Sequence, residues 1–226
     1  MKTHSPKLLF SALAKLISGL GIIMALLFLP AGGWHYWQAW LFIGLLFIPM
    51  ITMGIWLYCN QPELLVKRLN HKEKEQTQKG VVFLSGMMFI GGFILCALDN
   101  RLGWSNMPIW LTIASSVVFL LGYGLYAEVM RENAYLSRTV EVKEGQKLID
   151  KGLYGIVRHP MYTATILMFL SIPLILGSFC AMIVFALYPA LMVIRIQNEE
   201  QVLSTQLAGY IEYKQRVRYR LIPWVW

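Results

Sequence analysis

The stretch Trp37–Cys59, WQAWLFIGLLFIPMITMGIWLYC, contains no charged side chain and decides the fold class of this chain. At 1.5 Å per residue, a helix of roughly 23 residues crosses a bilayer hydrocarbon core of about 30 Å. Comparable apolar runs occupy residues 8–29, 81–98 and 107–127, and two shorter ones occupy 162–176 and 179–194. The sequence therefore predicts an all-α integral membrane protein with about six transmembrane helices.

The composition also fits a membrane environment. Of the 226 residues, 57% are hydrophobic and only 14% are charged, against about 25% charged in soluble domains. The two shorter runs, each about 22–24 Å long as helices, are predicted to form a hairpin that turns at Leu176-Gly177-Ser178. The first run follows Lys2 and Lys7 like a signal peptide, but Pro30-Ala31-Gly32 offers no A-x-A cleavage site, so we expect this run to remain.

The distribution of charge predicts the orientation. With both termini in the cytoplasm and six spans, nineteen of the twenty Lys and Arg residues lie inside, and Arg101 alone lies outside. Eleven of the twelve acidic residues also lie inside, so the net charge of +8 faces the cytoplasm. Anionic lipid headgroups are the expected partners of such a surface. A role in nucleic-acid binding is not expected, because no soluble domain carries this charge.

The cysteines and the overall pattern predict one membrane domain without a metal site. Cys59, Cys96 and Cys180 lie at or inside apolar runs, and none has the spacing of a metal-ligand motif. The chain contains no internal repeat or low-complexity segment. We therefore expect a single domain over residues 1–226, with two N-terminal spans in 1–59.

The densest polar stretch is Gly152–Tyr162, GLYGIVRHPMY. Pro160 disfavours helix at His159 and is well suited to begin a helix, so Arg158 and His159 are expected on an extended approach to a helix N-terminus. The free N–H groups of such an end suit an anionic ligand group such as a carboxylate. The alternative is a plain capped helix start, with Arg158 held against lipid phosphate.

A second polar cluster, Arg195–Glu200, follows the last apolar run. If the helix continues, Arg195 and Glu199 share a face and Glu200 turns away. One interpretation is a surface ion pair, contributing about 0–1 kcal/mol. The other is a pair of carboxylates that holds a cationic, hydroxylated ligand. The basic and aromatic tail Tyr210–Pro223 is typical of an interfacial helix on anionic headgroups, and it could also cover a site.

Together these stretches resemble the isoprenylcysteine carboxyl methyltransferase family and its bacterial relatives. The resemblance has three ordered parts: Gly152–Tyr162 with its Arg-His-Pro-Met-Tyr core, the Glu199-Glu200 pair, and the Tyr210–Pro223 tail with its Arg-Leu-Ile-Pro end. Weaker likeness at Asn60–Leu65 and Asp99–Trp104 extends it over roughly residues 60–226. The sequence departs from the pattern at Leu153, where many relatives have proline.

This resemblance implies an enzyme, an S-adenosylmethionine-dependent methyltransferase that acts on a lipophilic acceptor from the bilayer. The family-like core would be 60–226, with a cofactor region in 139–226 at the cytoplasmic face, and in a bacterium the membrane would be the inner one. The cofactor-binding residues implied by motif position are Gln146, Lys147, Leu148, Ile149, Tyr154, His159, Pro160, Met161, Tyr162 and Glu199. Arg158 and Arg195 are the implied catalytic residues, and Arg195 and Glu200 the substrate-binding ones. A further family contact within 139–145 could not be aligned.

The expected reaction is an in-line attack of the acceptor on the sulfonium methyl group, most like carboxyl O-methylation of an isoprenylcysteine-type substrate. A carboxylate acceptor is already ionised and needs no base, so Arg158 and Arg195 would orient it. A phospholipid amine would need a base, for which His159 or Glu200 could serve, and a thiol acceptor is a further alternative. A different class is an NADPH-dependent membrane reductase, because sterol reductases share part of the C-terminal pattern. A transporter or scaffold is disfavoured, because no span carries a central paired charge.

Overall fold

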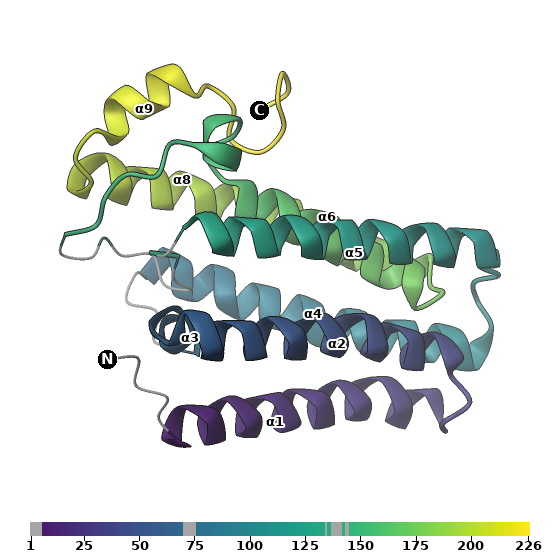
Figure 1. Ribbon diagram of the computed structural model, residues 1–226. Helices are drawn as coiled ribbons and strands as arrows, with labels where there is room; N and C mark the ends of the chain where they lie inside the picture. Colours follow the sequence, from purple (N-terminus) through teal and green to yellow (C-terminus); the bar gives the residue numbers. More distant parts are fainter. Residues whose placement is uncertain (1–5, 70–75, 134, 137–141, 143–144) are drawn as a thin grey trace.

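The computed structural model describes residues 6–69, 76–133, 135–136, 142 and 145–226, and all regular structure within them is helical. Figure 1 shows a bundle of long helices with short elements gathered at one end. The helices are α1 (Pro6–Ala31), α2 (Trp37–Asn60), α3 (Pro62–Leu69), α4 (Gln76–Leu102), α5 (Ile109–Glu132), the 3-10 turn η1 (Gly152–Gly155), α6 (Pro160–Ile175), α7 (Cys180–Phe185), α8 (Tyr188–Gln206) and α9 (Tyr210–Arg216).

Among the described residues, five helical segments are long and apolar enough to cross a membrane. They are α1, α2, α4, α5 and the segment Cys180–Gln206, which joins α7 and α8. Helix α6 is apolar but has 16 residues, about 24 Å. The prediction of an all-α integral membrane protein is therefore confirmed, and the predicted run 162–176 corresponds to this shorter helix.

The hairpin turn lies where the sequence predicts it. Helix α6 ends at Ile175, Gly177 adopts a φ of +80°, and α7 begins at Cys180. Only glycine adopts such a φ without strain. The helix continues beyond the apolar run that ends at Ile194 and reaches Gln206, so Arg195 and Glu199 lie on one continuous helix.

The continuation of α8 beyond the apolar run has a physical reason. Arg195 and Glu200 lie beyond the apolar run, but the folded chain buries both of them, with 8% and 3% exposure. Because their polar groups have partners inside the protein, α8 can continue through these residues instead of ending in a solvated loop. The polar end of α8 thereby becomes part of the folded structure at one end of the bundle.

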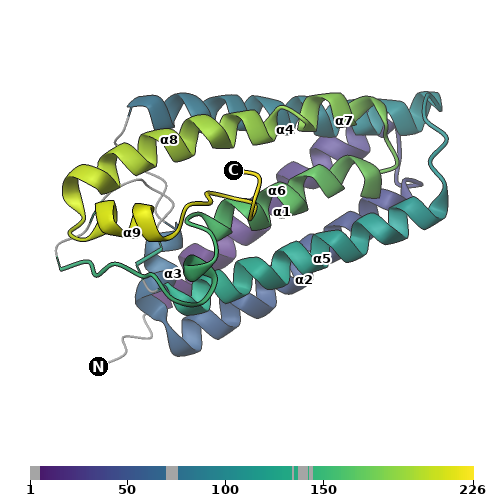
Figure 2. The same ribbon diagram turned by 90° about the horizontal axis from the view of Figure 1, so that it is seen from above.

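The helices form layers. Figures 1 and 2 together show α5, α6 and α8 in one layer over α2 and α4, with α1 beneath, and α6 between α5 and α8. Aromatic rings fill the space between the layers. The ring of Phe42 on α2 lies 5.7 Å from Phe93 on α4 and 6.1 Å from Phe119 on α5. Because lipid is as apolar as these side chains, close packing rather than burial from water holds such helices together.

Large apolar side chains cover the outside of the bundle. Exposed fractions of 66% to 77% occur on five different helices, at Ile17, Ile48, Phe83, Leu121 and Ile183. A soluble monomer rarely exposes so much apolar surface. The outer face is therefore the surface that contacts lipid.

Gly122 allows α5 and α6 to pack closely. A Cβ atom at this position would lie 2.8 Å from Met168 Cγ and 3.1 Å from the Ala164 carbonyl oxygen. Small residues at such contacts are the usual means of close helix packing in membranes.

Gly122→Ala is expected to destabilise the protein by about 1–3 kcal/mol, because the two helices must move apart. The measurement is thermal unfolding of the purified variant in detergent. The matched control is Gly124→Ala on the same helix, where a Cβ meets nothing within 4 Å and the better helix propensity of alanine contributes up to about 1 kcal/mol of stability. Equal stability of the two variants would contradict this account of the contact.

The end of the bundle that carries the short connections is tied by a buried carboxylate. Asp99, only 1% exposed, accepts hydrogen bonds from the Ser105 N–H (2.7 Å), the Ser105 hydroxyl (2.7 Å) and the Ser178 hydroxyl (2.5 Å). Tyr36 donates to the Leu176 carbonyl oxygen at 2.6 Å. These contacts fix the hairpin turn, and with it the relative position of α6 and α8.

The opposite end, which we call the site end, carries α3, η1 and α9 beside the starts of α1 and α4 (Figure 1). The basic residues of α3 and α9 therefore lie at this end. Arg101 lies at the other end, where its side chain packs against Gly32. Five residues of the predicted cytoplasmic set lie outside the described residues, namely Lys2, Lys72, Lys74, Arg138 and Lys143.

Candidate functional site

A cavity lies at the site end, between α6, α8, α9 and residues 146–149. Its empty space is about 850 Å³, a volume that includes solvent at the open mouth. The centre of a water molecule can occupy only about 100 Å³ of this space, so the cavity is narrow. Its wall comes from segments that are far apart in sequence.

The predicted site residues converge on this cavity. Both implied catalytic residues, Arg158 and Arg195, line it, and so do nine of the ten implied cofactor residues. The tenth, Pro160, is the buried first residue of α6 and does not belong to the described residues that line the cavity. Glu200 instead borders a second, more open hollow that residues of α8 form with Lys214 and Arg220. The nine are Gln146, Lys147, Leu148, Ile149, Tyr154, His159, Met161, Tyr162 and Glu199.

The extended approach to α6 is confirmed. Pro160 begins the helix, and the two residues before it pair with the C-terminal tail. The Arg158 N–H donates to the Tyr219 carbonyl oxygen and the His159 N–H to that of Arg220, both at 2.9 Å. The tail is therefore built into the same wall as the Arg-His-Pro motif.

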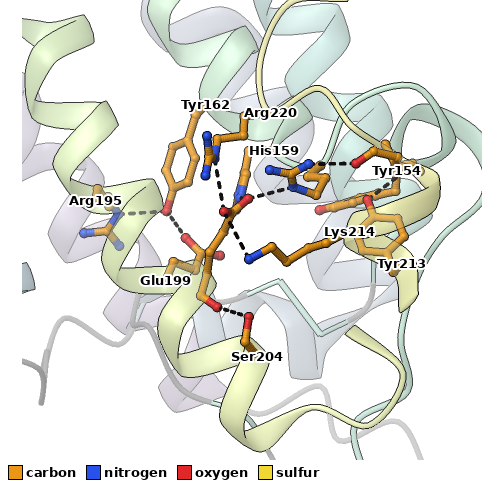
Figure 3. A network of polar contacts seen from close by, with 12 residues as sticks. Tyr154, His159, Tyr162, Arg195, Glu199, Ser204, Tyr213, Lys214 and Arg220 are labelled. Carbon is orange, nitrogen blue, oxygen red and sulfur yellow. Dashed lines mark hydrogen bonds and ion pairs between the residues drawn. The ribbon is translucent and has the colours of Figure 1, made fainter. Parts of the chain in front are cut away.

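Arg195, Tyr162 and Glu199 form a hydrogen-bonded chain at the cavity wall (Figure 3). Arg195 Nε donates to the Tyr162 hydroxyl at 2.8 Å, and this hydroxyl donates to Glu199 Oε2 at 2.6 Å. The interpretation as a plain surface ion pair is excluded, because Arg195 is only 8% exposed. The contacts hold the Glu199 carboxylate and the Arg195 guanidinium side by side in the wall.

Glu200 is the centre of a buried ion-pair network. Its Oε1 accepts a hydrogen bond from Arg158 Nε at 2.7 Å and lies 3.3 Å from His159 Nε2. Its Oε2 accepts from Arg220 Nε at 3.0 Å and lies 3.9 Å from Lys214 Nζ. One carboxylate thus joins α8 to the start of α6 and to the tail.

Arg158 has further partners in the same network. Its Nη1 donates to the carbonyl oxygens of Val217 and Arg218, both at 2.7 Å. The side chain is 6% exposed, which excludes the alternative that it contacts lipid phosphate. For both Arg158 and Glu200 this geometry favours a structural role, and the catalytic and substrate-binding roles stay predictions.

Tyrosine side chains line much of the cavity. The Tyr213 hydroxyl donates to the Tyr154 carbonyl oxygen at 2.7 Å, and Asn133 Nδ2 donates to the Tyr154 hydroxyl at 3.0 Å. Burial raises the pKa of Tyr154 to about 12, an effect that the hydrogen bond from Asn133 opposes only in part. Burial also raises the pKa values of Tyr210 and Tyr213. These three phenols are therefore neutral at physiological pH.

Several lining residues were missed by the sequence argument. Leu203 and Leu207 lie four and eight residues after Glu199, so the helical repeat alone could have found them. No sequence signal marks the segment after α5, where Asn133 Oδ1 accepts from the Tyr135 N–H at 2.9 Å. Two tyrosines of α9 line the cavity, which agrees with the alternative interpretation that the tail covers a site. The missed residues are Asn133, Tyr135, Leu136, Leu203, Leu207, Tyr210 and Tyr213.

Known proteins share most of the part of the chain that lines this cavity, with Tyr210 and Tyr213 outside the matched range. Residues 110–208 match the model of the family described as phospholipid methyltransferase. Over 115 residues, half of this chain, the sequence is 32% identical to the uncharacterized protein YpbQ of Bacillus subtilis and covers 68% of it. The chain belongs to the phospholipid methyltransferase family. The resemblance to isoprenylcysteine carboxyl methyltransferase-like membrane enzymes is thus confirmed at the level of the family.

A second relative of this phospholipid methyltransferase family member is named for a different activity. Over 91 residues, 39% of the chain, the sequence is 34% identical to the Delta(14)-sterol reductase TM7SF2 of Mus musculus. The match covers 22% of the mouse protein. This chain therefore spans only a minor part of that relative.

The sequence also left one family contact unassigned within residues 139–145. Of this segment, only positions 142 and 145 lie among the described residues.

Proposed function

We propose that this protein is an S-adenosylmethionine-dependent methyltransferase that methylates a lipophilic acceptor at the membrane, most like the carboxyl group of an isoprenylcysteine-type substrate. One observation carries the proposal. The motif residues from 146–149, 158–162 and 195–199 meet around one cavity at the polar end of a membrane bundle. The chain's membership of a methyltransferase family supports the same conclusion.

Membership of a methyltransferase family favours S-adenosylmethionine over NADPH as the cofactor, and Glu199 is an acidic group that suits it in a wall that also holds Lys147, Arg158 and Arg195. The Glu199 carboxylate and the tyrosine ring faces attract a cationic sulfonium group. A nicotinamide dinucleotide would bring several phosphate charges against that carboxylate. Arg158, which lines the cavity, is paired with Glu200. We therefore favour the methyltransferase over the reductase, whose support is the partial match to the mouse sterol reductase.

The N-terminus of α6 is the proposed site for the cofactor's carboxylate. Pro160 takes the first helical position, and Met161, the second residue of the helix, lines the cavity. Pro160 has no N–H, and the Tyr162 and Thr163 N–H groups donate to the His159 carbonyl oxygen, so it is the positive end of the helix dipole that would attract an anion here. The methionine part of S-adenosylmethionine carries a carboxylate and an ammonium group. The carboxylate would lie at this helix end and the ammonium group near Glu199.

Arg195 is the proposed substrate-orienting residue. When bound, S-adenosylmethionine supplies a methyl group on a positively charged sulfur. Arg195 is held in the wall by Tyr162, and a guanidinium group can bind a carboxylate through two parallel hydrogen bonds. Holding the acceptor in a reactive alignment can lower the barrier by several kcal/mol.

The alternative acceptor is a phospholipid amine, which the name of the phospholipid methyltransferase family favours. An amine must lose a proton, and the sequence offered His159 or Glu200 as the base. Glu200 is held among two guanidinium groups and His159, an arrangement poorly suited to proton removal. A carboxylate acceptor needs no such group, and we therefore place it first, with a thiol as a further alternative.

We also propose that the site end faces the cytoplasm. The basic residues of α3 and α9 lie there, whereas Arg101 lies at the other end. Such asymmetry fixes the orientation of membrane proteins during insertion. Anionic headgroups of that leaflet would contact α3 and α9.

S-Adenosylhomocysteine, the product form of the cofactor, is expected to raise the apparent unfolding temperature of the detergent-solubilised protein. Ligand at about 100 times its dissociation constant contributes about 2.7 kcal/mol of stability. NADPH at equal concentration should leave the unfolding temperature unchanged, and protection by NADPH alone would contradict the methyltransferase proposal.

The acceptor class is then tested by incubating source membranes with the enzyme and methyl-labelled S-adenosylmethionine. A carboxyl methyl ester releases labelled methanol on mild alkaline treatment, whereas an N-methyl or S-methyl product keeps its label. Alkali-stable label would therefore favour the amine or thiol alternative.

A further inference from the structure

We propose that the Tyr210 hydroxyl is a cofactor-binding group that donates a hydrogen bond to the adenosyl part of the bound methyl donor. The inference rests on the proposed function and adds a residue that lies outside the matched family range of 110–208. It begins from a buried hydroxyl that lacks a partner in the folded protein.

The Tyr210 side chain is 3% exposed, and its hydroxyl has no hydrogen-bond partner among the residues that the structure describes. Buried tyrosine hydroxyls normally find a partner, because an unsatisfied buried donor is costly. This hydroxyl belongs to a residue of the cavity wall. A ligand in the cavity is therefore positioned to supply the missing partner.

The neighbouring tyrosines of the wall show that Tyr210 is an exception. The Tyr162 hydroxyl bonds to Arg195 and Glu199, and the Tyr154 hydroxyl accepts from Asn133. The Tyr213 hydroxyl, on the same short helix as Tyr210, donates to the Tyr154 carbonyl oxygen. Of these four described tyrosines, three are satisfied within the protein and one is left for the ligand.

The backbone directs Tyr210 to this position. Gly209 has a φ of +80°, a conformation that side-chain-bearing residues rarely adopt, and it separates α8 from α9. The Tyr210 N–H donates to the Leu207 carbonyl oxygen at 3.2 Å. The turn folds α9 back beside α8, so that Tyr210 and Glu199 line the same cavity.

The surroundings of Tyr210 indicate which part of the cofactor it meets. Its ring packs in a cluster with Leu207, Tyr213 and Val217, against Leu148 and Leu203. The Tyr213 ring centroid lies 5.7 Å away. An apolar and aromatic wall with one hydrogen-bond donor suits a flat heteroaromatic base rather than a charged amino-acid group.

The hydroxyl is also in the protonation state that donation requires. Burial is the main cause that raises the pKa of Tyr210, and the carboxylates of Glu200 and Glu199 raise it further. The group is therefore a neutral donor at physiological pH. The adenine ring nitrogens and ribose oxygens of the adenosyl part are acceptors for it.

The test is Tyr210→Phe, which keeps the ring and removes only the hydroxyl. The dissociation constant for S-adenosylhomocysteine, measured by calorimetry in detergent, is expected to rise roughly 3- to 10-fold. The unfolding temperature of the ligand-free variant should be unchanged or higher, because an unsatisfied buried group has been removed. A purely structural role predicts instead an unchanged dissociation constant and a lower unfolding temperature of the ligand-free variant.

Tyr213→Phe is the matched control. It removes a hydroxyl that has a partner inside the protein, so it should lower the unfolding temperature of the ligand-free protein. Wild-type affinity in Tyr210→Phe, or a ligand-free loss of stability like that of Tyr213→Phe, would overturn the assignment of Tyr210 alone. Absence of S-adenosylhomocysteine binding by the wild-type protein would instead overturn the proposed function together with this inference.

Discussion

Glu200→Gln is expected to lower the free energy of unfolding by about 3–5 kcal/mol, the usual effect of breaking a buried ion pair from one side. The substitution leaves Arg158, which is 6% exposed, without its anionic partner. It also removes the negative charge that pairs with Arg220 of the tail and that lies beside the His159 ring. The start of α6 and the tail should separate, and cofactor binding should be lost with them.

The effect is measured by chemical or thermal unfolding of the purified variant in detergent, together with limited proteolysis of the tail. Glu199→Gln is the matched control, because it changes the same chemical group one residue away and leaves the Glu200 ion pairs intact. We expect little loss of stability in that control. A Glu200→Gln protein as stable as wild type, with a protected tail, would refute the role assigned to the network.

Glu199→Ala is expected to weaken binding of S-adenosylhomocysteine by about 100-fold or more while the protein remains folded. Hydrogen bonds to a charged group contribute about 1.5–3 kcal/mol each, and each factor of ten in affinity corresponds to about 1.4 kcal/mol. Within the fold, Tyr162 loses one partner but keeps the hydrogen bond from Arg195. Stability should therefore change much less than in Glu200→Gln.

The readouts are calorimetric titration with S-adenosylhomocysteine and the unfolding temperature without ligand. Glu212→Ala, which removes an exposed carboxylate of α9, controls for a general change in charge near the site. Normal affinity in Glu199→Ala would show that this carboxylate does not hold the cofactor. A variant that fails to fold would contradict the division of roles between the two adjacent glutamates.

The features that depend on local pattern could be predicted from the sequence. Span length follows from the apolar runs, the hairpin turn from Gly177, and the start of α6 from Pro160. The spacing of four residues placed Arg195 and Glu199 on one helical face, and both line the cavity. Each of these inferences needs only the geometry of a single helix or turn.

The features that depend on distant segments could not be predicted in this way. The pairing of Arg158 with Glu200 joins residues 42 positions apart and requires the tail to lie beside both. Tyr210 could be noted only as part of an aromatic tail, because the lack of a partner for its hydroxyl exists only in the folded chain. The burial of Arg195 and Glu200 likewise depends on partners from α6 and from the tail, which the pattern of α8 alone does not identify.

The backbone pairing between residues 158–159 and 219–220 has a consequence for biosynthesis. Translation proceeds from the N-terminus, so every membrane helix has left the ribosome before Tyr219 and Arg220 can reach their partners. A partly made chain inserted in the bilayer lacks one side of the pocket wall. The cavity at the site end is thus completed only after all the membrane helices have been made, and a copy that lacks the tail also lacks the part of the wall that Tyr210 and Tyr213 supply.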